Sequence, residues 1–459
     1  MCCWYVPLSR RIARTGRLVR SIVFTATTIG ASLAGPPELS PYDGPVLSTA
    51  AFVAAEGVNT HIPYTDGGYA DPARIVRELK FLGVDRVRDS IIAPGINGSA
   101  PLRTYWEVAH AGIKFDFIVG GGTFGRTSGS WTSPSLEDRL DNIRWVARAE
   151  PGSVIAIEGA NEINNEPIAY DGINKDRLRA ALQMQRDLYR AVRSDSRLAT
   201  VPIYYFTGYD AGGIPIGPDP AKEPGLADFN NQHPYPRNAE PPAAWVARRQ
   251  ALTNGSSGPA VYTETGYSTN IRNRDGVPPD VQARYTLALL LDAAKAGITT
   301  TYLYELMDAY APGARQGDAG YGLFDWQGNP KPVALAIHNM NAILASPKAD
   351  GRSLPMTPLA LTVGAESSAT KFLLLQRSPR EHVVAIWSEQ TLFKNGARQT
   401  PAPSRAELAW PEPQDVALYD PVTGKDALHT EHGVRSFSVT VSDHPLFLIV
   451  SPPSPATAQ

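Results

Sequence analysis

The sequence contains very little cysteine. Its two cysteines, Cys2 and Cys3, are adjacent and lie at the start of a chain of 459 residues. A chain of this length can bury a large apolar core, so it does not need the disulfide bonds that stabilise small secreted domains. We therefore expect neither a disulfide framework nor cysteine-based catalysis.

The sequence also lacks an excess of charge of one sign. Its 43 Lys and Arg residues nearly balance 45 Asp and Glu residues, and the formal net charge is −2. This balance gives no electrostatic reason to bind nucleic acid. Hydrophobic residues make up 43% of the chain and charged residues 19%, which is typical of a globular protein and excludes a disordered chain.

Long apolar runs are missing as well. The apolar segment near the start, residues 21–30, contains three threonines and follows five arginines. It is too short and too polar to span a membrane. However, a basic start, a short apolar run and the small residues 31–34 occur in the order found in secretory signal peptides. We interpret residues 1–34 as a signal peptide and expect a secreted or periplasmic protein; the alternative is a disordered basic leader or a misassigned start.

From residue 57 onward, short apolar runs alternate with amphipathic segments. One such segment begins with Asp71-Pro72, which is typical of a helix start with Asp as the N-cap and Pro in the first turn. The predicted helices are 72–82, 101–111, 135–149, 174–192, 243–252, 279–296 and 332–344. The predicted strands are 58–62, 84–88, 113–119, 154–157, 202–206, 226–232, 260–263 and 298–303.

Alternating strands and helices indicate a parallel sheet, and eight such units favour closure into a (β/α)8 TIM barrel over residues 35–347. An open, doubly wound sheet is the alternative. After residue 348, apolar runs such as 371–375, 383–387 and 446–450 lie between turns without helical periodicity. They predict a separate antiparallel β-sandwich domain over residues 348–459.

In a TIM barrel, catalytic side chains lie where strands end and loops begin. Glu162 and Glu264 follow the fourth and seventh predicted strands, so they can face each other. Paired carboxylates on separate strands suit glycoside hydrolysis, which needs one ionised nucleophile and one protonated acid. Glu158 also follows strand four, and we expect it to point into the barrel and pair with a cation. Other polar residues after strands are His61, Tyr64, Arg88, Asp89, Asn161, His233, Tyr235, Tyr304 and Glu305.

These segments resemble those of retaining glycoside hydrolases of clan A. Gly159-Ala-Asn161-Glu162-Ile-Asn164 resembles the Asn-Glu-Pro-Asn stretch that ends their strand four. Val261-Tyr-Thr-Glu264-Thr-Gly266 is similar to their strand-seven nucleophile segment, with similar spacing between the two glutamates. His233-Pro-Tyr235 is similar to their strand-six segment, and Arg88 to their strand-two Arg. The resemblance covers residues 57–345 and points to a family 39-like or family 5-like enzyme; an appended β-sandwich is common in family 39.

The resemblance implies hydrolysis by double displacement through a covalent glycosyl-enzyme intermediate. Glu162 would be the general acid and then the general base, and Glu264 would be the nucleophile. Asn161 would donate a hydrogen bond to the sugar 2-hydroxyl group. Tyr235 and Arg88 would hold the Glu264 carboxylate and keep its pKa low, because hydrogen bonds and a cation favour the charged form.

The resemblance also implies that His233 contacts the substrate or Glu162. The sequence departs from the clan at strand eight, which ends in Tyr304-Glu305 where many members place a substrate-facing Trp. Tyr304 is a candidate for substrate binding, and Trp326 or Tyr302 could supply the missing sugar platform. Glu305 is the alternative nucleophile.

We expect no cofactor and no catalytic metal. Residues 120–125 match the G-x-G-x-x-G spelling, but no helix start follows them directly, so a dinucleotide site is not expected. The eight His residues show no metal-ligand spacing. The expected partner is a carbohydrate substrate, and the oligomeric state is left open. The remaining alternatives are an exo-acting α-L-arabinofuranosidase, a transglycosylase, and a barrel that binds a polysaccharide without cleaving it.

Overall fold

The computed structural model describes most of the chain after its first residues. The described residues are 37–92, 100–120, 130–131, 133–165, 168–208, 217–247, 258–313, 320–345 and 355–453. The predicted signal peptide, residues 1–34, therefore lies outside the described residues. Within the described residues, no helix has both the length and the hydropathy needed to cross a membrane.

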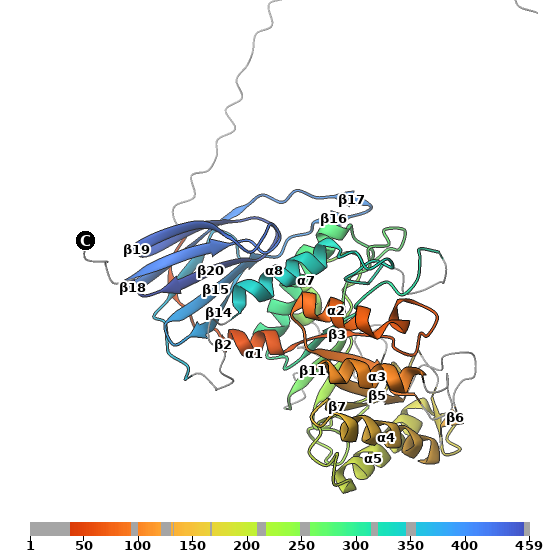
Figure 1. The fold of residues 1–459 in the computed structure, drawn as a ribbon. Coiled ribbons are helices and arrows are strands. Elements are labelled where there is room, and N and C mark those ends of the chain that lie inside the picture. The colour runs from red at the N-terminus through yellow and green to blue at the C-terminus, as the bar shows by residue number, and fades with distance from the viewer. Residues whose placement is uncertain are drawn as a thin grey trace, which may run out of the picture. The chain divides into compact units, whose positions relative to one another are not determined.

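A parallel sheet of eight strands forms the barrel (Figure 1). An isolated bridge between Tyr204 and Phe229, with a hydrogen bond of 3.1 Å from Tyr205 N to Phe229 O, nearly closes it. The predicted TIM barrel is therefore confirmed, and the doubly wound alternative is wrong. In sheet order the strands are β10 (Asn230–Gln232), β11 (Ala260–Thr265), β12 (Thr301–Leu303), β3 (Glu56–Asn59), β4 (Arg86–Ser90), β5 (Lys114–Gly120), β7 (Val154–Ala160) and β9 (Ile203–Tyr204).

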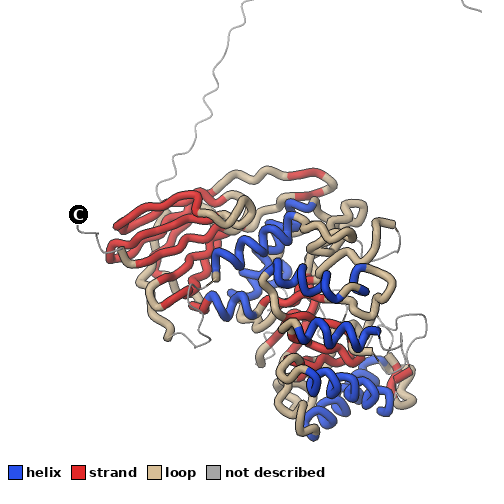
Figure 2. The backbone as a smooth tube through the Cα atoms, in the orientation of Figure 1, coloured by secondary structure: helices blue, strands red, loops and turns tan. Residues whose placement is uncertain are grey.

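Helices connect and cover these strands (Figure 2). They are α1 (Thr49–Ala54), α2 (Pro72–Leu82), α3 (Ala100–His110), α4 (Ser133–Ala149), α5 (Arg177–Ser194), α7 (Pro279–Lys295) and α8 (Pro332–Leu344). Helix α2 begins as the sequence predicts, because the Asp71 side chain accepts a hydrogen bond from Arg74 N and Pro72 is the first helical residue. The predicted helix 243–252 is helical over 243–247, and the rest of it lies outside the described residues.

The second domain contains one eight-stranded, mostly antiparallel sheet. Its order is β1-β13-β18-β20-β15-β14-β2, and β19 pairs with β18. The strands are β1 (Ser40–Pro41), β2 (Val46–Ser48), β13 (Thr362–Ala365), β14 (Thr370–Ser378), β15 (Glu381–Ser388), β18 (Ser404–Tyr419), β19 (Ala427–Val441) and β20 (Leu446–Ser451). Short two-stranded pairs lie elsewhere: β6 (Ser130–Trp131) with β8 (Ala169–Tyr170), and β16 (Phe393–Lys394) with β17 (Ala397–Arg398).

The sheet domain extends beyond the predicted boundary. Strand β1 pairs with β13, and β2 runs parallel to β14. Residues 40–48 therefore contribute to the sheet, although the sequence prediction placed them with the barrel. The physical reason is that the edges of β13 and β14 offer unpaired backbone groups, which these two short strands satisfy.

The central strands of this sheet are buried on both faces. Along β14, Leu373 and Leu375 join the core that contains the barrel, whereas Phe372 and Leu374 join a second core within the sheet domain. This alternation follows from the two-residue period of a strand. Trp387 belongs to the first core, and its exposed fraction is 0%. The sheet domain therefore covers one flank of the barrel with the same strands that form its own core.

Candidate active site

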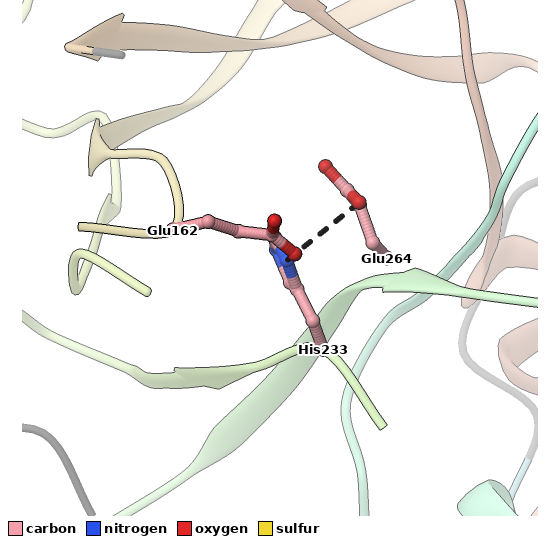
Figure 3. Close-up of side chains that lie close together, drawn as sticks. All are labelled: Glu162, His233 and Glu264. Atoms are coloured by element: carbon pink, nitrogen blue, oxygen red, sulfur yellow. Dashed lines mark hydrogen bonds and ion pairs between the residues drawn. The ribbon is translucent and has the colours of Figure 1, made fainter. Parts of the chain in front are cut away.

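Six predicted residues meet at the carboxyl ends of the barrel strands. Arg88 lies in β4, Glu264 lies in β11, and Asn161 and Glu162 directly follow β7. His233 follows β10, two residues before Tyr235. Figure 3 shows Glu162, His233 and Glu264 converging from different strands. The structure brings the two glutamates together, as the strand-end prediction expected, and their catalytic roles stay predictions.

Glu264 is held as a charged carboxylate. Arg88 Nη1 donates to Oε1 at 2.5 Å, and the Tyr235 hydroxyl donates to Oε2 at 2.8 Å. His233 Nδ1 lies 3.6 Å from the same Oε2 atom. Burial by itself would raise the pKa of Glu264, but the neighbouring His233 and Arg88 and the hydrogen bond from Tyr235 lower the pKa below its ordinary value. An ionised, oriented carboxylate is what a nucleophile requires.

Arg88 is fixed by carboxylate and amide oxygens on all sides. Its Nε and Nη2 atoms each donate to Glu158 at 2.7 Å, as the prediction that Glu158 pairs with a cation required. Nη1 also donates to Asn59 Oδ1 at 2.9 Å, and Nη2 donates to Asn161 Oδ1 at 2.8 Å. With the bond to Glu264, every N–H group of the guanidinium has a partner. Burial opposes the charge, but Glu158 and Glu264 raise the pKa of Arg88, so it stays protonated.

Glu162 has a different environment from Glu264. Its Oε1 atom lies 2.9 Å from His233 Nδ1, and its Oε2 atom accepts a hydrogen bond of 3.4 Å from Asn165. This contact confirms the predicted pairing of His233 with Glu162, whereas contact of His233 with a substrate stays a prediction. The Glu162 backbone has a φ of 41°, a left-handed conformation that is unfavourable for a residue with a Cβ atom and that often occurs at functional sites.

The two glutamates are partly open and close together. The exposed fractions are 8% for Glu162 and 9% for Glu264. A carboxylate oxygen of Glu162 and one of Glu264 lie within 4.8 Å of each other. These oxygens are closer together than the gap of about 6.5–9.5 Å that separates the carboxyl groups of inverting enzymes.

Aromatic side chains line the site beside Glu264. The rings of Tyr235, Tyr304 and Tyr321 contact one another edge to face, with centroids 5.6–6.2 Å apart. The Tyr304 hydroxyl lies 3.1 Å from His61 Nε2, and the His61 ring stacks on Tyr64 at 4.7 Å. Burial lowers the pKa of His61 to about 4, so its ring is neutral near pH 7. The predicted position of Tyr304 at the site is confirmed; its contact with a substrate stays a prediction.

The other two platform candidates lie elsewhere. Tyr302 is fully buried in the barrel interior with Ala156, Tyr204 and Val261, so it cannot stack on a sugar. Trp326 has an exposed fraction of 43%, and its carbonyl accepts a hydrogen bond of 3.0 Å from Arg74 of α2. This contact places Trp326 beside α2, and its role in substrate binding stays a prediction.

The rival nucleophile Glu305 belongs to a neighbouring network. It accepts a hydrogen bond of 3.1 Å from the Tyr69 hydroxyl and lies 3.4 Å from His61 Nε2. Its exposed fraction is 2%. Glu264, which has the cationic support and faces Glu162, fits the nucleophile role better.

The cluster of Glu162, His233 and Glu264 also has the spacing of a metal site, since one atom from each lies within 4.8 Å of the others. Two features of the described residues oppose a cation there. Arg88 and Tyr235 already occupy both oxygens of Glu264, and the Arg88 guanidinium would repel a metal ion. The absence of a catalytic metal stays a prediction.

No protein-family model matches the sequence, and no curated protein matches it. Solved structures do match the fold. A family 39 glycoside hydrolase (GH39) enzyme from Xanthomonas axonopodis pv. citri has a TM-score of 0.56 at 13% identity, covering 93% of this chain and 99% of that chain. A family 39 glycoside hydrolase from Bacteroides cellulosilyticus WH2 has a TM-score of 0.57 at 13% identity, covering 89% and 83%. A monomeric β-xylosidase from Caulobacter crescentus CB15 has a TM-score of 0.54 at 14% identity, covering 90% and 98%.

The chain has the fold of family 39 glycoside hydrolases. The likeness extends over the barrel and the sheet domain together, so it confirms the predicted two-domain, family 39-like architecture. At 13–14% identity the likeness concerns the fold, and the assignment of chemistry rests on the geometry of the site.

Proposed function

We propose that this protein is a retaining glycoside hydrolase that acts by double displacement. One observation carries the proposal: two glutamates at the ends of β7 and β11 lie with oxygens within 4.8 Å, one beside Arg88 and the other beside His233. Retaining enzymes place their two carboxyl groups about 5–5.5 Å apart, which this separation matches better than the wider gap of inverting enzymes. The family 39 fold supports the same class of reaction.

In the first step, a Glu264 oxygen attacks the anomeric carbon while Glu162 gives its proton to the leaving oxygen. The glycosidic C–O bond breaks, the leaving group departs as a neutral alcohol, and the sugar is left esterified to Glu264. Arg88 and Tyr235 hold Glu264 so that its attacking oxygen is fixed, which lowers the entropic part of the barrier. Asn161 is placed beside the pair through its bond to Arg88.

In the second step, Glu162 is ionised and acts as a base. It removes a proton from a water molecule, whose oxygen attacks the anomeric carbon from the side that the leaving group vacated. The ester bond to Glu264 breaks, the sugar leaves with its original configuration, and both glutamates return to their starting states. If a sugar hydroxyl replaces the water, the same step gives transglycosylation, so that alternative shares this site.

The names of the structural neighbours suggest which substrates to test first. One structural neighbour is named a β-xylosidase and another, from Croceicoccus marinus, a glucosidase. We propose aryl β-xylosides and β-glucosides as the first substrates to test, with α-L-arabinofuranosides as the alternative. Secretion is proposed on the basis of residues 1–34 and can be checked by the N-terminal sequence of protein recovered from outside the cytoplasm.

The decisive experiment uses a mechanism-based label. The protein is incubated with the 2,4-dinitrophenyl 2-deoxy-2-fluoro glycoside of the sugar that it hydrolyses, and the labelled peptide is identified by mass spectrometry. We expect one label per chain, on Glu264. A label on Glu305 would contradict the assignment of the nucleophile, and a wild-type protein that hydrolyses no glycan or aryl glycoside would favour the non-catalytic binding barrel.

A further inference from the structure

His233 has a second ring nitrogen whose partner is not a catalytic carboxylate. While Nδ1 faces Glu162, Nε2 lies 3.0 Å from the hydroxyl oxygen of Thr263, which is buried in β11. A hydroxyl group has one proton and can also accept, so its other contacts decide whether it gives a proton to the ring or receives one.

The other contacts of the Thr263 hydroxyl group require it to donate its only proton to them. Its hydroxyl lies 2.8 Å from Asn231 Oδ1 and 3.3 Å from Glu158 Oε1. Asn231 donates through Nδ2 to the Tyr205 carbonyl at 3.1 Å, which orients its Oδ1 atom as an acceptor. Glu158 is bound on both oxygens by Arg88 and also accepts. The Thr263 hydroxyl must therefore donate to one of these acceptors, and its oxygen can only accept from His233.

We infer that Thr263 is a positioning residue, which, through Asn231, holds the proton of His233 on Nε2 and thereby keeps the proton of the catalytic acid between His233 Nδ1 and Glu162. With Nε2 protonated, a neutral His233 presents a bare Nδ1 atom to Glu162 at 2.9 Å. Two acceptors at that distance repel each other unless one proton lies between them. The acid is then a His233–Glu162 pair that shares one proton.

The charges around His233 favour retention of that shared proton. Burial alone would lower the pKa of His233, but the neighbouring Glu264 and the bond to Glu162 raise it above its ordinary value, against the opposing effect of Arg88. The charged groups near the His233 ring or its Thr263 partner are Glu158, Glu162, Glu264 and Arg88. Tyr235 lies next to this set through its hydrogen bond to Glu264.

The inference rests on the proposed function and gives it a test of its own. In Thr263→Val, Nε2 loses its acceptor, so His233 can move its proton to Nδ1 and donate it to an ionised Glu162. This stabilises the deprotonated form of the pair, and the pKa of the acid falls. Thr263→Ser is the matched control, since it keeps the hydroxyl group.

The readout is the pH profile of kcat/KM with two aryl glycosides of the hydrolysed sugar. A 4-nitrophenyl glycoside needs more proton donation than a 2,4-dinitrophenyl glycoside, whose leaving group is a weak base. For Thr263→Val we expect the basic limb of the 4-nitrophenyl profile to move down by about one pH unit, a loss of about 10-fold on that limb. We expect little change with the dinitrophenyl substrate, and a wild-type profile for Thr263→Ser.

Equal losses with both substrates, or an unmoved basic limb, would show that Thr263 has only a structural role. Neutron diffraction from wild-type crystals tests the proposed proton position on His233 without a variant and without an activity measurement. It should show hydrogen on His233 Nε2 and a Thr263 hydroxyl directed at Asn231 or Glu158; a bare Nε2 atom would overturn the inference. A wild-type protein that hydrolyses no glycoside would instead contradict the proposed function. The neutron result would still show whether Thr263 holds the proton of His233 on Nε2.

Discussion

Two buried glutamates at opposite ends of the barrel strands show how neighbouring groups decide the charge of a carboxyl group. Glu264, in β11, has Arg88, Tyr235 and His233 around it, and its pKa is lowered despite burial. Glu56, the first residue of β3, accepts one hydrogen bond of 3.0 Å from Asn341, and burial raises its pKa to about 8. The same side chain is therefore an anion at one end of the barrel and a neutral acid at the other. Among the described residues, His233 and Arg88 lower the pKa of Glu264, whereas burial dominates the pKa of Glu56.

The largest expected effect separates these two glutamates by activity. Glu264→Gln removes the proposed nucleophile and should lower kcat by at least about 10⁴-fold on the preferred aryl glycoside. Glu56→Gln is the matched control, because it makes the same change in a residue that is 3% exposed at the other end of the strands. Its kcat should equal that of the wild type. Measured turnover near wild type for Glu264→Gln would refute the site.

A second variant asks whether the sheet domain contributes stability rather than chemistry. Trp387→Ala removes a fully buried side chain that packs against the barrel core, and such truncations cost about 3–5 kcal/mol of unfolding free energy. We expect a lower urea midpoint but an unchanged kcat per folded molecule. If kcat fell tenfold in conditions where the variant is folded, the sheet domain would have to take part in shaping the site.

A third prediction concerns pH and Glu56. Its folded-state pKa of about 8 lies above its ordinary value, so the folded protein keeps a proton that the unfolded chain has lost over the range between them. Stability therefore falls as pH rises from about 4.5 to 8. Glu56→Gln should remove this share of the pH dependence. Plots of Tm against pH for the wild type and the variant should therefore differ most at the alkaline end. Parallel plots of Tm against pH between about 4.5 and 8 would show that Glu56 is ionised in the folded protein.

The smallest expected effect is the loss of stability when the N-cap of α2, which the sequence predicted, is removed. Asp71→Ala removes the N-cap of α2, where the side chain accepts from Arg74 N at 3.1 Å, and should cost about 1 kcal/mol of stability. Asp426→Ala changes an exposed Asp in the sheet domain and should have an effect within about 0.5 kcal/mol. Equal effects of the two changes, measured by urea unfolding, would mean that the cap contributes nothing.

Local signals explain which parts of the fold could be predicted. Helix α2 was predicted to start at Pro72 and helix α8 to span 332–344, because caps and prolines act within one turn of the chain. Strand limits were less accurate: residues 60–62 were predicted to be in a strand, but β3 ends at Asn59. The end of a strand depends on pairing with neighbours, which a single segment does not encode. Strands β1 and β2 were missed because they are short and their partners are distant in sequence.

The candidate site likewise has residues that local sequence predicts and residues that depend on how distant strands pair. Glu162 and Glu264 could be predicted because each lies near the carboxyl end of a predicted apolar strand, 154–157 or 260–263. The role of Asn59 could not, since its bond to Arg88 depends on the register between β3 and β4, which brings Asn59 beside Arg88. The one available signal was that Asn59 is a polar, hydrogen-bonding residue within the first predicted strand, 58–62. The contact of Thr263 with His233 likewise depends on how β10 and β11 align.

The pairing of residues 40–48 with residues 362–376 has a consequence for biosynthesis. The Tyr42 hydroxyl accepts a hydrogen bond from Leu374 N, a contact across 332 residues. Strands β1 and β2 therefore lack their partners until residues 362–376 have been translated. Loop closure over such a distance is slow, so completion of this sheet is expected to be a late, post-translational event.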